Sequence, residues 1–287
     1  MNFRKQVGCL LVLAFFLPVT LLAKSPESDS LVFAVMGDVP RSPTEDIVLQ
    51  KQIEEHNKLS HAEFMVHVGD IKAGREPCDE AVYRKVAGYL LKLDIPVFIV
   101  PGDNEWNDCD DPQVAWTYWQ KYFMNFENHW QNIPQVVRQE KRPENFAFIR
   151  HNVLVMGINL VGGWVFDQAI WDSVLQDDAE WVEKQFAANA QHVGAAVVCA
   201  QANPKEKHRL FMKRFLSAAK KFAKPILFIH GDGHFWLYDD PWLEPNIVRV
   251  QIDKGGIAPP VQVIVNPAAE QPFRFNRTLF PQPKADE

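Results

Sequence analysis

The sequence lacks an excess of basic residues. It holds 30 Lys and Arg against 36 Asp and Glu, a formal net charge of −6 at pH 7. Because a protein that neutralises a nucleic-acid backbone needs a basic face, we do not expect nucleic acid as a partner. With 47% hydrophobic and 23% charged residues, the chain is neither disordered nor fibrous. No repeat and no long linker divides it, so we expect one domain over residues 24–287.

The sequence also lacks an apolar run of the length and continuity typical of a membrane-spanning helix. The apolar run at residues 7–22 is short and interrupted by Pro18. It follows Arg4 and Lys5 and precedes Ala23, which is typical of an export signal, although an uncleaved membrane anchor is the alternative. We therefore predict a signal peptide at residues 1–23 and a periplasmic or secreted protein that has no membrane contact after cleavage.

Four apolar runs of strand length end in acidic turns. The turns contain Gly37-Asp38, Gly69-Asp70, Gly102-Asp103 and Gly231-Asp232-Gly233-His234. Glycine allows the backbone to turn sharply, and a polar group placed just after a buried strand lies at the carboxyl edge of an α/β sheet. Four such turns predict one shared site.

The order of apolar segments predicts an α/β fold. Strands at 31–36, 63–68 and 95–100 alternate with helices, one beginning near 42–46 and one at 79–93, which predicts parallel pairing with right-handed crossovers. Further along we expect a hairpin, then alternating helices and strands, and finally a second sheet made of short strands. These segments are 146–150 with 153–158 for the hairpin, 177–189, 195–200, 205–222 and 225–230 for the alternation, and 247–252, 261–265 and 273–275 for the short strands. The tail after Thr278 is Pro-rich, and we expect it to be loose.

An aromatic-rich stretch at about 106–145 interrupts this alternation, with a helix expected at 113–126. Aromatic side chains at such spacing usually pack in a core, and we favour packing onto the sheet. A lid over the site is the alternative, for which Trp106 is the first candidate and Trp164 and Trp236 are similar ones.

The chain has few cysteines, four in all, and Cys9 falls within the predicted signal. Cys78 follows the Asp70 turn and Cys109 follows the Asp103 turn, so both should lie in loops at the same sheet edge. An exported protein can oxidise them, and we predict a disulfide between them. Cys199 lies in an apolar run and is expected to be a buried free thiol.

The polar groups at the predicted edge are metal-ligand types. Carboxylates gathered this closely cannot all remain ionised without a cation, which favours a metal site. The alternative is that each Asp only caps the helix or turn that follows it. We favour metal because four such turns occur and the last ends in Asp-Gly-His. The candidate ligands are Asp38, Asp70, Asp103, Asp232 and His234.

With these turns, the sequence resembles the calcineurin-like metallophosphoesterases. It is most similar to a bacterial exported branch with the motifs Gly-Asp-Val-Pro, Gly-Asp-Asn-Glu-Trp, Gln-Ala-Asn-Pro and His-Gly-Asp-x-His, over residues 32–275. The resemblance implies an α/β/β/α sandwich of two mixed sheets with a two-metal site. It places the leading Asp of the family at Asp38, the bridging Asp at Asp70 and the last His at His234.

The sequence departs from the family pattern where the family has histidines. Pro40 replaces the His after the first Asp, Asn104 replaces the His credited with assisting the leaving group, and Gln201 and Asp232 replace two ligand histidines. Asp103 stands in place of the ligand Asn. The predicted cofactor is two divalent ions, with Mn²⁺ or Mg²⁺ favoured and Ca²⁺, Fe and Zn²⁺ as alternatives, because oxygen ligands dominate the set.

The resemblance implies a phosphoesterase that hydrolyses a small-molecule phosphoric ester with a metal-bound hydroxide. We expect Asp70 and Asn104 to be catalytic, the latter by donating a hydrogen bond to a phosphoryl oxygen, and His230 and Glu105 to support the ligands from behind. The candidate substrate-binding residues are Arg41, Lys72, Arg75, Trp106 and Trp236. The alternative function is a non-catalytic protein that binds a metal or another ligand on the same fold. The sequence makes no prediction of oligomeric state.

Overall fold

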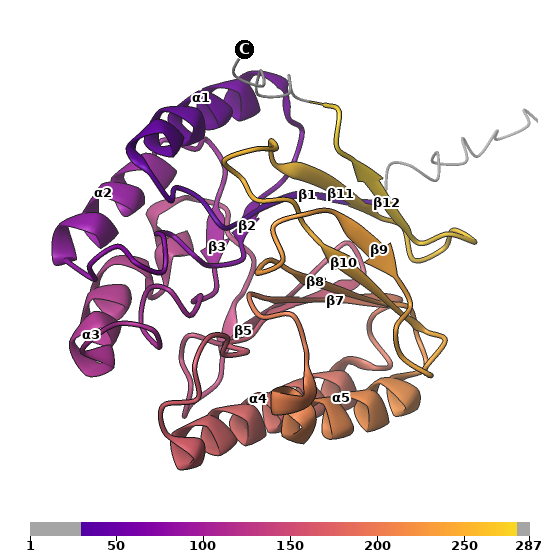
Figure 1. The fold of residues 1–287 in the computed structure, drawn as a ribbon. Helices are drawn as coiled ribbons and strands as arrows, with labels where there is room; N and C mark the ends of the chain where they lie inside the picture. Colours follow the sequence, from indigo (N-terminus) through magenta and orange to yellow (C-terminus); the bar gives the residue numbers. More distant parts are fainter. Residues whose placement is uncertain (1–29, 280–287) are drawn as a thin grey trace, which may run out of the picture.

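Two β-sheets lie face to face at the centre of the molecule, with helices on both outer faces (Figure 1). The structure is a computed structural model that describes residues 30–279. The predicted signal peptide and all but the first residues of the predicted loose tail lie outside the described residues. The four-layer α/β/β/α arrangement predicted from the sequence is confirmed. Within the described range, no helix is long and apolar enough to cross a membrane.

The first sheet has five strands in the order β12-β11-β1-β2-β3. Strands β1, β2 and β3 are parallel, whereas β11 is antiparallel to β1 and β12 is antiparallel to β11. Their bounds are Leu31–Met36 for β1, Met65–His67 for β2, Val97–Ile99 for β3, Val261–Val265 for β11 and Phe273–Asn276 for β12.

The second sheet has seven strands in the order β4-β5-β6-β7-β8-β10-β9. Strands β6, β7, β8 and β10 are parallel, and the other three are antiparallel to their neighbours. Their bounds are Val137–Arg138 for β4, Phe146–Arg150 for β5, Val153–Gly157 for β6, Ala195–Ala200 for β7, Ile226–His230 for β8, Leu237–Asp239 for β9 and Ile247–Gln251 for β10.

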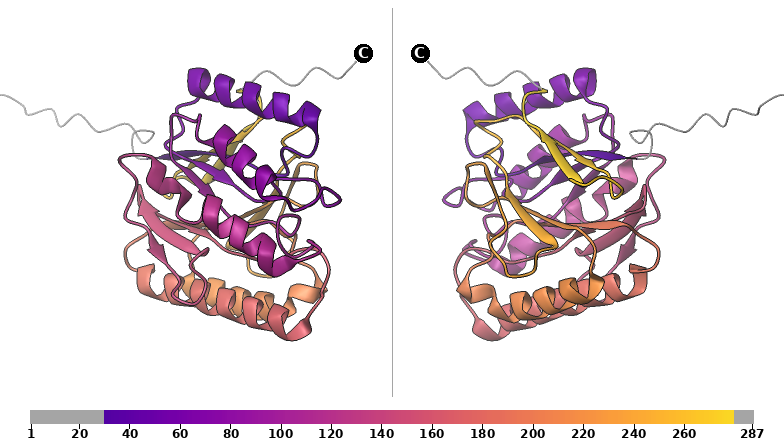
Figure 2. Two further views of the ribbon diagram at one scale, coloured as in Figure 1. Left: turned by 90° about the vertical axis from the view of Figure 1, so that its left-hand side faces the viewer. Right: turned by 90° about the vertical axis from the view of Figure 1, so that its right-hand side faces the viewer.

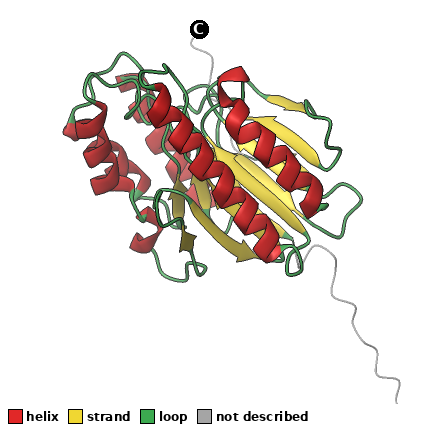
Figure 3. Cartoon of the chain, turned by 90° about the horizontal axis from the view of Figure 1, so that it is seen from below, coloured by secondary structure: helices red, strands yellow, loops and turns green. Residues whose placement is uncertain are grey.

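The helices divide between the two outer faces. Helices α1, α2 and α3 cover the first sheet, and α4 and α5 lie side by side over the second, where they form a single layer (Figures 2 and 3). Their bounds are Pro43–Leu59 for α1, Glu80–Leu90 for α2, Pro112–Phe123 for α3, Gln168–Asn189 for α4 and Arg209–Phe222 for α5, with short 3-10 turns at Phe126–His129 (η2) and Glu206–His208 (η3).

The central strands are apolar on both faces because each face meets a different core. In β1, Phe33 and Val35 point between the two sheets, whereas Ala34 and Met36 point toward the helices. The same alternation in β7 places Val197 between the sheets. Parallel strands buried in this way end together at one edge, where the turns that follow them are held by a rigid framework.

The structure corrects several segment predictions. Strands β11 and β12 do not join a second sheet but return to the first, beside β1. Helix α4 begins at Gln168 rather than at residue 177, because the Asp167 side chain accepts hydrogen bonds from the first turn. The edge strands β4 and β9 were not predicted, since two or three residues carry too little periodicity.

The aromatic-rich stretch packs as a core rather than as a lid. Trp119, Phe123 and Phe126 are buried between α3, α2 and the first sheet. Trp106 is also nearly buried and packs against Trp116. The favoured prediction of packing onto the sheet is therefore confirmed.

Candidate metal centre

The predicted turns meet at the carboxyl edge of the two sheets. Asp38, Asp70 and Asp103 follow β1, β2 and β3, which are adjacent and parallel, while Asp232 follows β8 of the second sheet. The backbone N–H of Asp38 donates to the Gly69 carbonyl at 3.0 Å, so the first two turns are held side by side.

Several of the predicted ligands have an uncommon backbone conformation. The φ angles of Asp38, Asp70, Asp232 and His234 are 53°, 59°, 67° and 67°, all in the left-handed region. Non-glycine residues adopt this region at an energetic cost, and such residues cluster at functional sites. The turns therefore hold these side chains in a conformation that local propensity alone does not favour.

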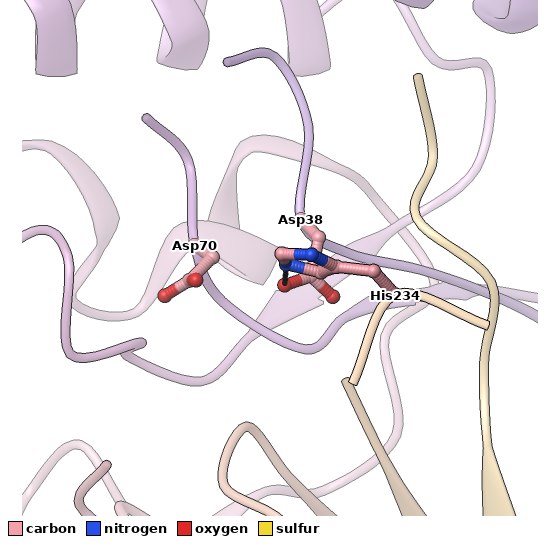
Figure 4. Close-up of side chains that lie close together, drawn as sticks. All are labelled: Asp38, Asp70 and His234. Carbon is pink, nitrogen blue, oxygen red and sulfur yellow. Dashed lines mark ion pairs between the residues drawn. The ribbon is translucent and has the colours of Figure 1, made fainter. Parts of the chain in front are cut away.

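Three candidate ligands form a tight group, here called the Asp38 cluster: Asp38, Asp70 and His234. One ligand atom from each lies within 4.8 Å of the others, so the three can share one cation (Figure 4). Asp38 is fully buried and Asp70 is 3% exposed, whereas His234 Nε2 lies 3.2 Å from Asp38 Oδ1 on a partly exposed ring.

A second set of oxygen atoms, here called the Asp103 group, is formed by Asp103, Gln201 and Asp232. Asp103 Oδ1 and Gln201 Oε1 face the same point beside Gly162, at 2.8 and 2.9 Å from the position of a β-carbon there. The Gly231 N–H donates to the backbone carbonyl of Gln201 at 3.1 Å, and this hydrogen bond holds the Asp232 turn next to the group.

The carboxylates of both groups repel one another. Burial, and then the charges of Asp103, Asp38 and Glu105, raise the pKa of Asp70 well above its usual range. Burial, followed by Asp108 and Asp232, raises the pKa of Asp103 to about 6. A cation placed among these groups would relieve the repulsion.

The donor atoms fit a divalent cation. Both carboxylate oxygens of Asp38, Oδ1 of Asp103 and both side-chain polar atoms of Gln201 are buried without a hydrogen-bond partner in the part of the chain that the structure describes. Buried polar atoms are nearly always paired, so this concentration of unpaired oxygens fits a cation-binding site. Oxygen ligands with one imidazole favour Mg²⁺ or Mn²⁺.

Glu105 holds the Asp70 turn in place. Its carboxylate accepts hydrogen bonds from the backbone N–H groups of Asp70, Gly102 and Ile71 at 3.1, 2.6 and 3.3 Å. Burial raises the pKa of Glu105 to about 7, although the backbone hydrogen bonds lower it. This arrangement is the one expected of a group that supports a ligand from behind.

His67 was not predicted, although it joins two of the turns. Its Nδ1 accepts from the Gly69 N–H at 3.2 Å, which leaves Nε2–H to donate to the Val39 carbonyl at 3.1 Å. The signal in the sequence was a single histidine inside the apolar run 63–68.

His230 was predicted to support the ligands from behind. Its Nδ1–H donates to the backbone carbonyl of the neighbouring Gly231 at 2.8 Å, and its Nε2 is buried and unpaired.

The Asn104 side chain contacts Asp70 and does not project into solvent. Its Nδ2 donates to Asp70 Oδ2 at 2.6 Å and to the Lys72 carbonyl at 3.1 Å. Both amide protons are therefore in use, and the prediction that Asn104 donates to a phosphoryl oxygen does not match this geometry. The side chain orients Asp70.

The predicted substrate-binding cations have three different locations. Arg41 lies in the Asp38 cluster, with Nη1 2.7 Å from His234 Nε2. Lys72 is fully buried, and its Nζ donates to the carbonyls of Ala73 and Asn104, so it is not available to a substrate. Its position was predicted wrongly because a long side chain can turn inward to satisfy backbone groups. Arg75 is exposed.

The side chain of Trp106, a predicted substrate-binding residue, lies away from the candidate ligands. This side chain lines a cavity of ≈ 150 Å³ with Trp116 and Phe166, and none of the candidate ligands lines that cavity. Trp236 is partly buried against Phe275, with the guanidinium of Arg277 over its ring. Trp164, by contrast, is 81% exposed on the loop between β6 and α4, which passes the Asp103 group at Gly162.

Two lysines near the Asp103 group were not predicted. Lys205 Nζ lies 3.7 Å from Asp232 Oδ2, and Lys207 Nζ donates to the Gly163 carbonyl at 2.6 Å. Burial lowers the pKa of Lys207, while the charges of Asp103 and Asp232 raise it. Lys205 follows the Gln-Ala-Asn-Pro motif directly and Lys207 lies two residues further on, which was the available signal.

The predicted disulfide is confirmed. Cys78 and Cys109 are bonded, with 5.9 Å between their Cα atoms and a sequence separation of 31. It connects the segments after Asp70 and Asp103. Cys199 is a buried free thiol, as expected.

Removal of this disulfide should destabilise the protein. A Cys78→Ala/Cys109→Ala variant should lose roughly 3 kcal/mol of unfolding free energy, since the bond constrains the unfolded chain. Urea unfolding of the oxidised wild type, the reduced wild type and the variant measures it. The reduced wild type should match the variant, and a loss below about 1 kcal/mol would contradict the expectation.

His67 should make the fold sensitive to acid. Burial lowers its pKa from 6.5 to about 4, so the folded ring stays neutral where the unfolded chain binds a proton. Stability present above pH 6.5 is therefore lost as the pH falls from about 6.5 toward 4, by about 2–3 kcal/mol at pH 4.5. The buried rings of His56, His208 and His230 act in the same direction.

The His67→Gln variant isolates the contribution of His67. Its amide can occupy the same position but cannot take up the proton, so the loss of unfolding free energy between pH 7.5 and 4.5 should be smaller than in wild type by about 2–3 kcal/mol. Urea unfolding at both pH values, in the presence of chelator, measures the difference. Equal losses in the two proteins would contradict this assignment.

Comparisons with known proteins find similarity in structure and not in sequence. No protein-family model and no curated protein matches the chain. The structure of GAP50, the anchor in the inner membrane complex of Plasmodium, is similar over 86% of this chain and 88% of its own, with a TM-score of 0.54 and 12% identity. A 5'-nucleotidase from Candida albicans SC5314 is similar over 85% of this chain, with a TM-score of 0.50 and 13% identity. The chain has a metallophosphatase-like fold. It spans about half of the nucleotidase, 51% of that chain.

Proposed function

We propose that the protein is an exported, metal-dependent phosphoesterase that hydrolyses a phosphoric ester of a small molecule. The observation that carries the proposal is the set of buried, unpaired oxygens of Asp38, Asp103 and Gln201 at the carboxyl edge of the strands. The fold alone does not decide the reaction, since the two similar structures are described as an anchor and a nucleotidase.

The candidate ligands of the divalent ion are the Asp38 cluster and the Asp103 group. A bound divalent ion lowers the pKa of a coordinated water and so supplies a nucleophile near neutral pH. The chain supports this by fixing Asp70, whose backbone is held by Glu105 and whose carboxylate is held by Asn104. A ligand oriented by its neighbours needs no rearrangement when the ion binds.

Cations around the edge match the charge of a phosphoryl group. Lys205 and Lys207 lie beside the Asp103 group, and Arg41 lies in the Asp38 cluster. Positive groups placed near the oxygens of a transferring phosphoryl group stabilise the charge that develops on them. These three residues replace Lys72 as the proposed substrate-binding cations.

The proposed preference is for esters with good leaving groups. An amide cannot protonate a departing alkoxide, and the family histidine that would do so is Asn104 here. Aryl esters and anhydrides do not need that proton, so they should react faster than alkyl esters. Export is proposed from the amino-terminal signal pattern, with support from the disulfide, which is typical of oxidising compartments.

Metal analysis of protein purified without chelator, followed by a screen of phosphomonoesters and diesters with Mn²⁺ and Mg²⁺, tests the function. We expect bound divalent metal and hydrolysis of aryl esters that depends on it. Protein that binds no divalent ion, or metal-loaded protein that hydrolyses no activated ester faster than its Asp70→Asn variant, would overturn the enzyme proposal.

The second candidate is a metal- or ligand-binding protein without activity. It is favoured by one observation, the two hydrogen bonds that keep both amide protons of Asn104 away from a substrate. In this case the metal would bind, and no ester in the screen would be turned over.

The Asn104→His variant distinguishes the two candidates. Imidazole Nδ1 lies as far along the side chain as the amide nitrogen, so it can keep the hydrogen bond to Asp70 while Nε2 extends toward the leaving group. For an enzyme, turnover of alkyl esters should rise by up to about 10²–10⁴, the usual contribution of a general acid, while that of aryl esters changes little. Steady-state kinetics on matched alkyl and aryl phosphates measure both. Equal effects on the two substrates would contradict a leaving-group role for position 104.

A further inference from the structure

Arg41 occupies the Asp38 cluster in the manner of a cation. Its Nη1 lies 2.7 Å from His234 Nε2, 3.4 Å from Asp70 Oδ2 and 3.6 Å from Asp38 Oδ1. These are the three residues whose ligand atoms are close enough to share one ion. One guanidinium nitrogen is therefore near all three candidate ligands at once.

The chemistry of these contacts makes Arg41 and a metal ion competitors. A guanidinium is always charged and can only donate hydrogen bonds, so His234 Nε2 must accept with its lone pair. That lone pair is the one a metal would need. His234 Nε2 and Asp38 Oδ1 are thus two acceptors only 3.2 Å apart, and the positive charge of Arg41 lies against both.

The backbone of Arg41 is anchored, so this placement does not depend on the side chain alone. Its N–H donates to Glu45 Oε2 at 2.7 Å, and Glu45 is in turn paired with Lys254. Ser42, the next residue, caps helix α1 by accepting from the Glu45 N–H at 3.2 Å. The Arg41 side chain is 18% exposed.

Within the described residues, no positive side chain is hydrogen-bonded to the deepest oxygens of the Asp103 group, since Lys207, whose charge interacts with Asp103, donates to the Gly163 carbonyl instead. Asp103 Oδ1 and Gln201 Oε1 are buried and unpaired within residues 30–279. Lys205 approaches only Asp232, the outermost member, whose side chain is 34% exposed. The two halves of the site therefore differ, because a guanidinium lies among the ligand atoms of the Asp38 cluster, whereas no positive side chain within residues 30–279 is paired with Asp103 Oδ1 or Gln201 Oε1.

We propose that Arg41 takes the place of one of the two ions predicted from the sequence. The protein then binds a single divalent ion, at the Asp103 group with Asp70, and Arg41 supplies the second positive charge. The inference rests on the proposed metal site and deepens it, by setting the number of ions and assigning the other charge to the chain itself. It also accounts for Pro40, since the ligand histidine missing there has no ion to bind.

The number of ions bound per chain tests the inference. Equilibrium dialysis against Mn²⁺ with elemental analysis should give one ion for wild type and two for Arg41→Met, which removes the charge but keeps the aliphatic stem. Arg75→Met is the matched control, because it removes the same charge from an exposed position on the loop after Asp70 and should still bind one. Electron paramagnetic resonance should show coupled Mn²⁺ pairs in Arg41→Met only.

Each alternative result has a distinct meaning. Two ions in wild type would overturn the inference, whether or not Arg41→Met folds, and would leave the phosphoesterase proposal intact. One ion in wild type, in Arg41→Met and in a second variant, Arg41→Gln, would also overturn it. Absence of bound metal from every protein would overturn the metal site itself, and with it the proposed function.

Discussion

Replacement of Asp70 by Asn should abolish metal binding and hydrolysis together. Asp70 belongs to the Asp38 cluster and also interacts with Asp103 of the Asp103 group, with Arg41 and with Asn104. An amide carries no charge, and one of its two ligand positions becomes a donor that repels a cation. We expect no measurable ion binding by calorimetry and a loss of turnover of at least about 10²-fold, the usual effect of removing one electrostatic group from an active site.

The same variant should remain folded. The raised pKa of Asp70 means that the buried ionised carboxylate is disfavoured when no cation is present. In chelator, Asp70→Asn should therefore be at least as stable as wild type in urea. Asp79→Asn is the matched control, since Asp79 is exposed at the start of α2 and its side chain makes no capping hydrogen bond. Turnover by Asp70→Asn equal to that of this control would contradict the assigned role.

Gly69→Ala should produce the largest loss of stability. Gly69 has φ +83°, and an added β-carbon would lie 2.5 Å from the backbone nitrogen of Gly102 and 2.8 Å from its Cα. The turns after β2 and β3 would be forced apart, and the residue would be strained in the left-handed region. We expect a loss of about 3–5 kcal/mol in urea unfolding, as for other severe backbone and packing conflicts.

Gly88→Ala is the control for this substitution. Gly88 lies in α2 with nothing within 4 Å of an added β-carbon. Alanine has the higher helix propensity, so stability should rise by up to about 1 kcal/mol. A Gly69→Ala variant within about 1 kcal/mol of wild type would show that the two turns are not in the close contact described here.

The sequence predicts the layered fold well because the parallel strands carry a strong signal. Strand β7 is apolar at every position, and the bounds predicted for it match the structure. The sequence predicts the second half of the fold less well. Strands β11 and β12 were predicted to belong to a final separate sheet, but β11 pairs with β1, which lies more than 200 residues earlier, at Leu31–Met36. Local pattern contains no information about such distant pairing.

The candidate site is predicted in its members but not in its internal contacts. A glycine before an aspartate at the end of a strand is a local signal, and it predicted the position of Asp38, Asp70 and Asp103 at one edge of the sheet. The directions of long side chains are not local. Lys72 turns inward to backbone carbonyls, and Arg41, on the neighbouring loop, reaches His234, which is 193 residues away in sequence. Sequence spacing alone could not predict that the Lys72 side chain turns inward whereas the Arg41 side chain lies among the candidate ligands.

Crystals soaked in Mn²⁺ would test the central claim, that the carboxyl edge binds a divalent cation, most directly. An anomalous difference map records where the ion lies and whether more than one is present. We predict one peak, in contact with Asp103, Gln201, Asp232 and Asp70, and an Arg41 guanidinium that remains against His234. A map without a peak at this edge, obtained from protein that is folded and saturated with Mn²⁺, would contradict the metal site.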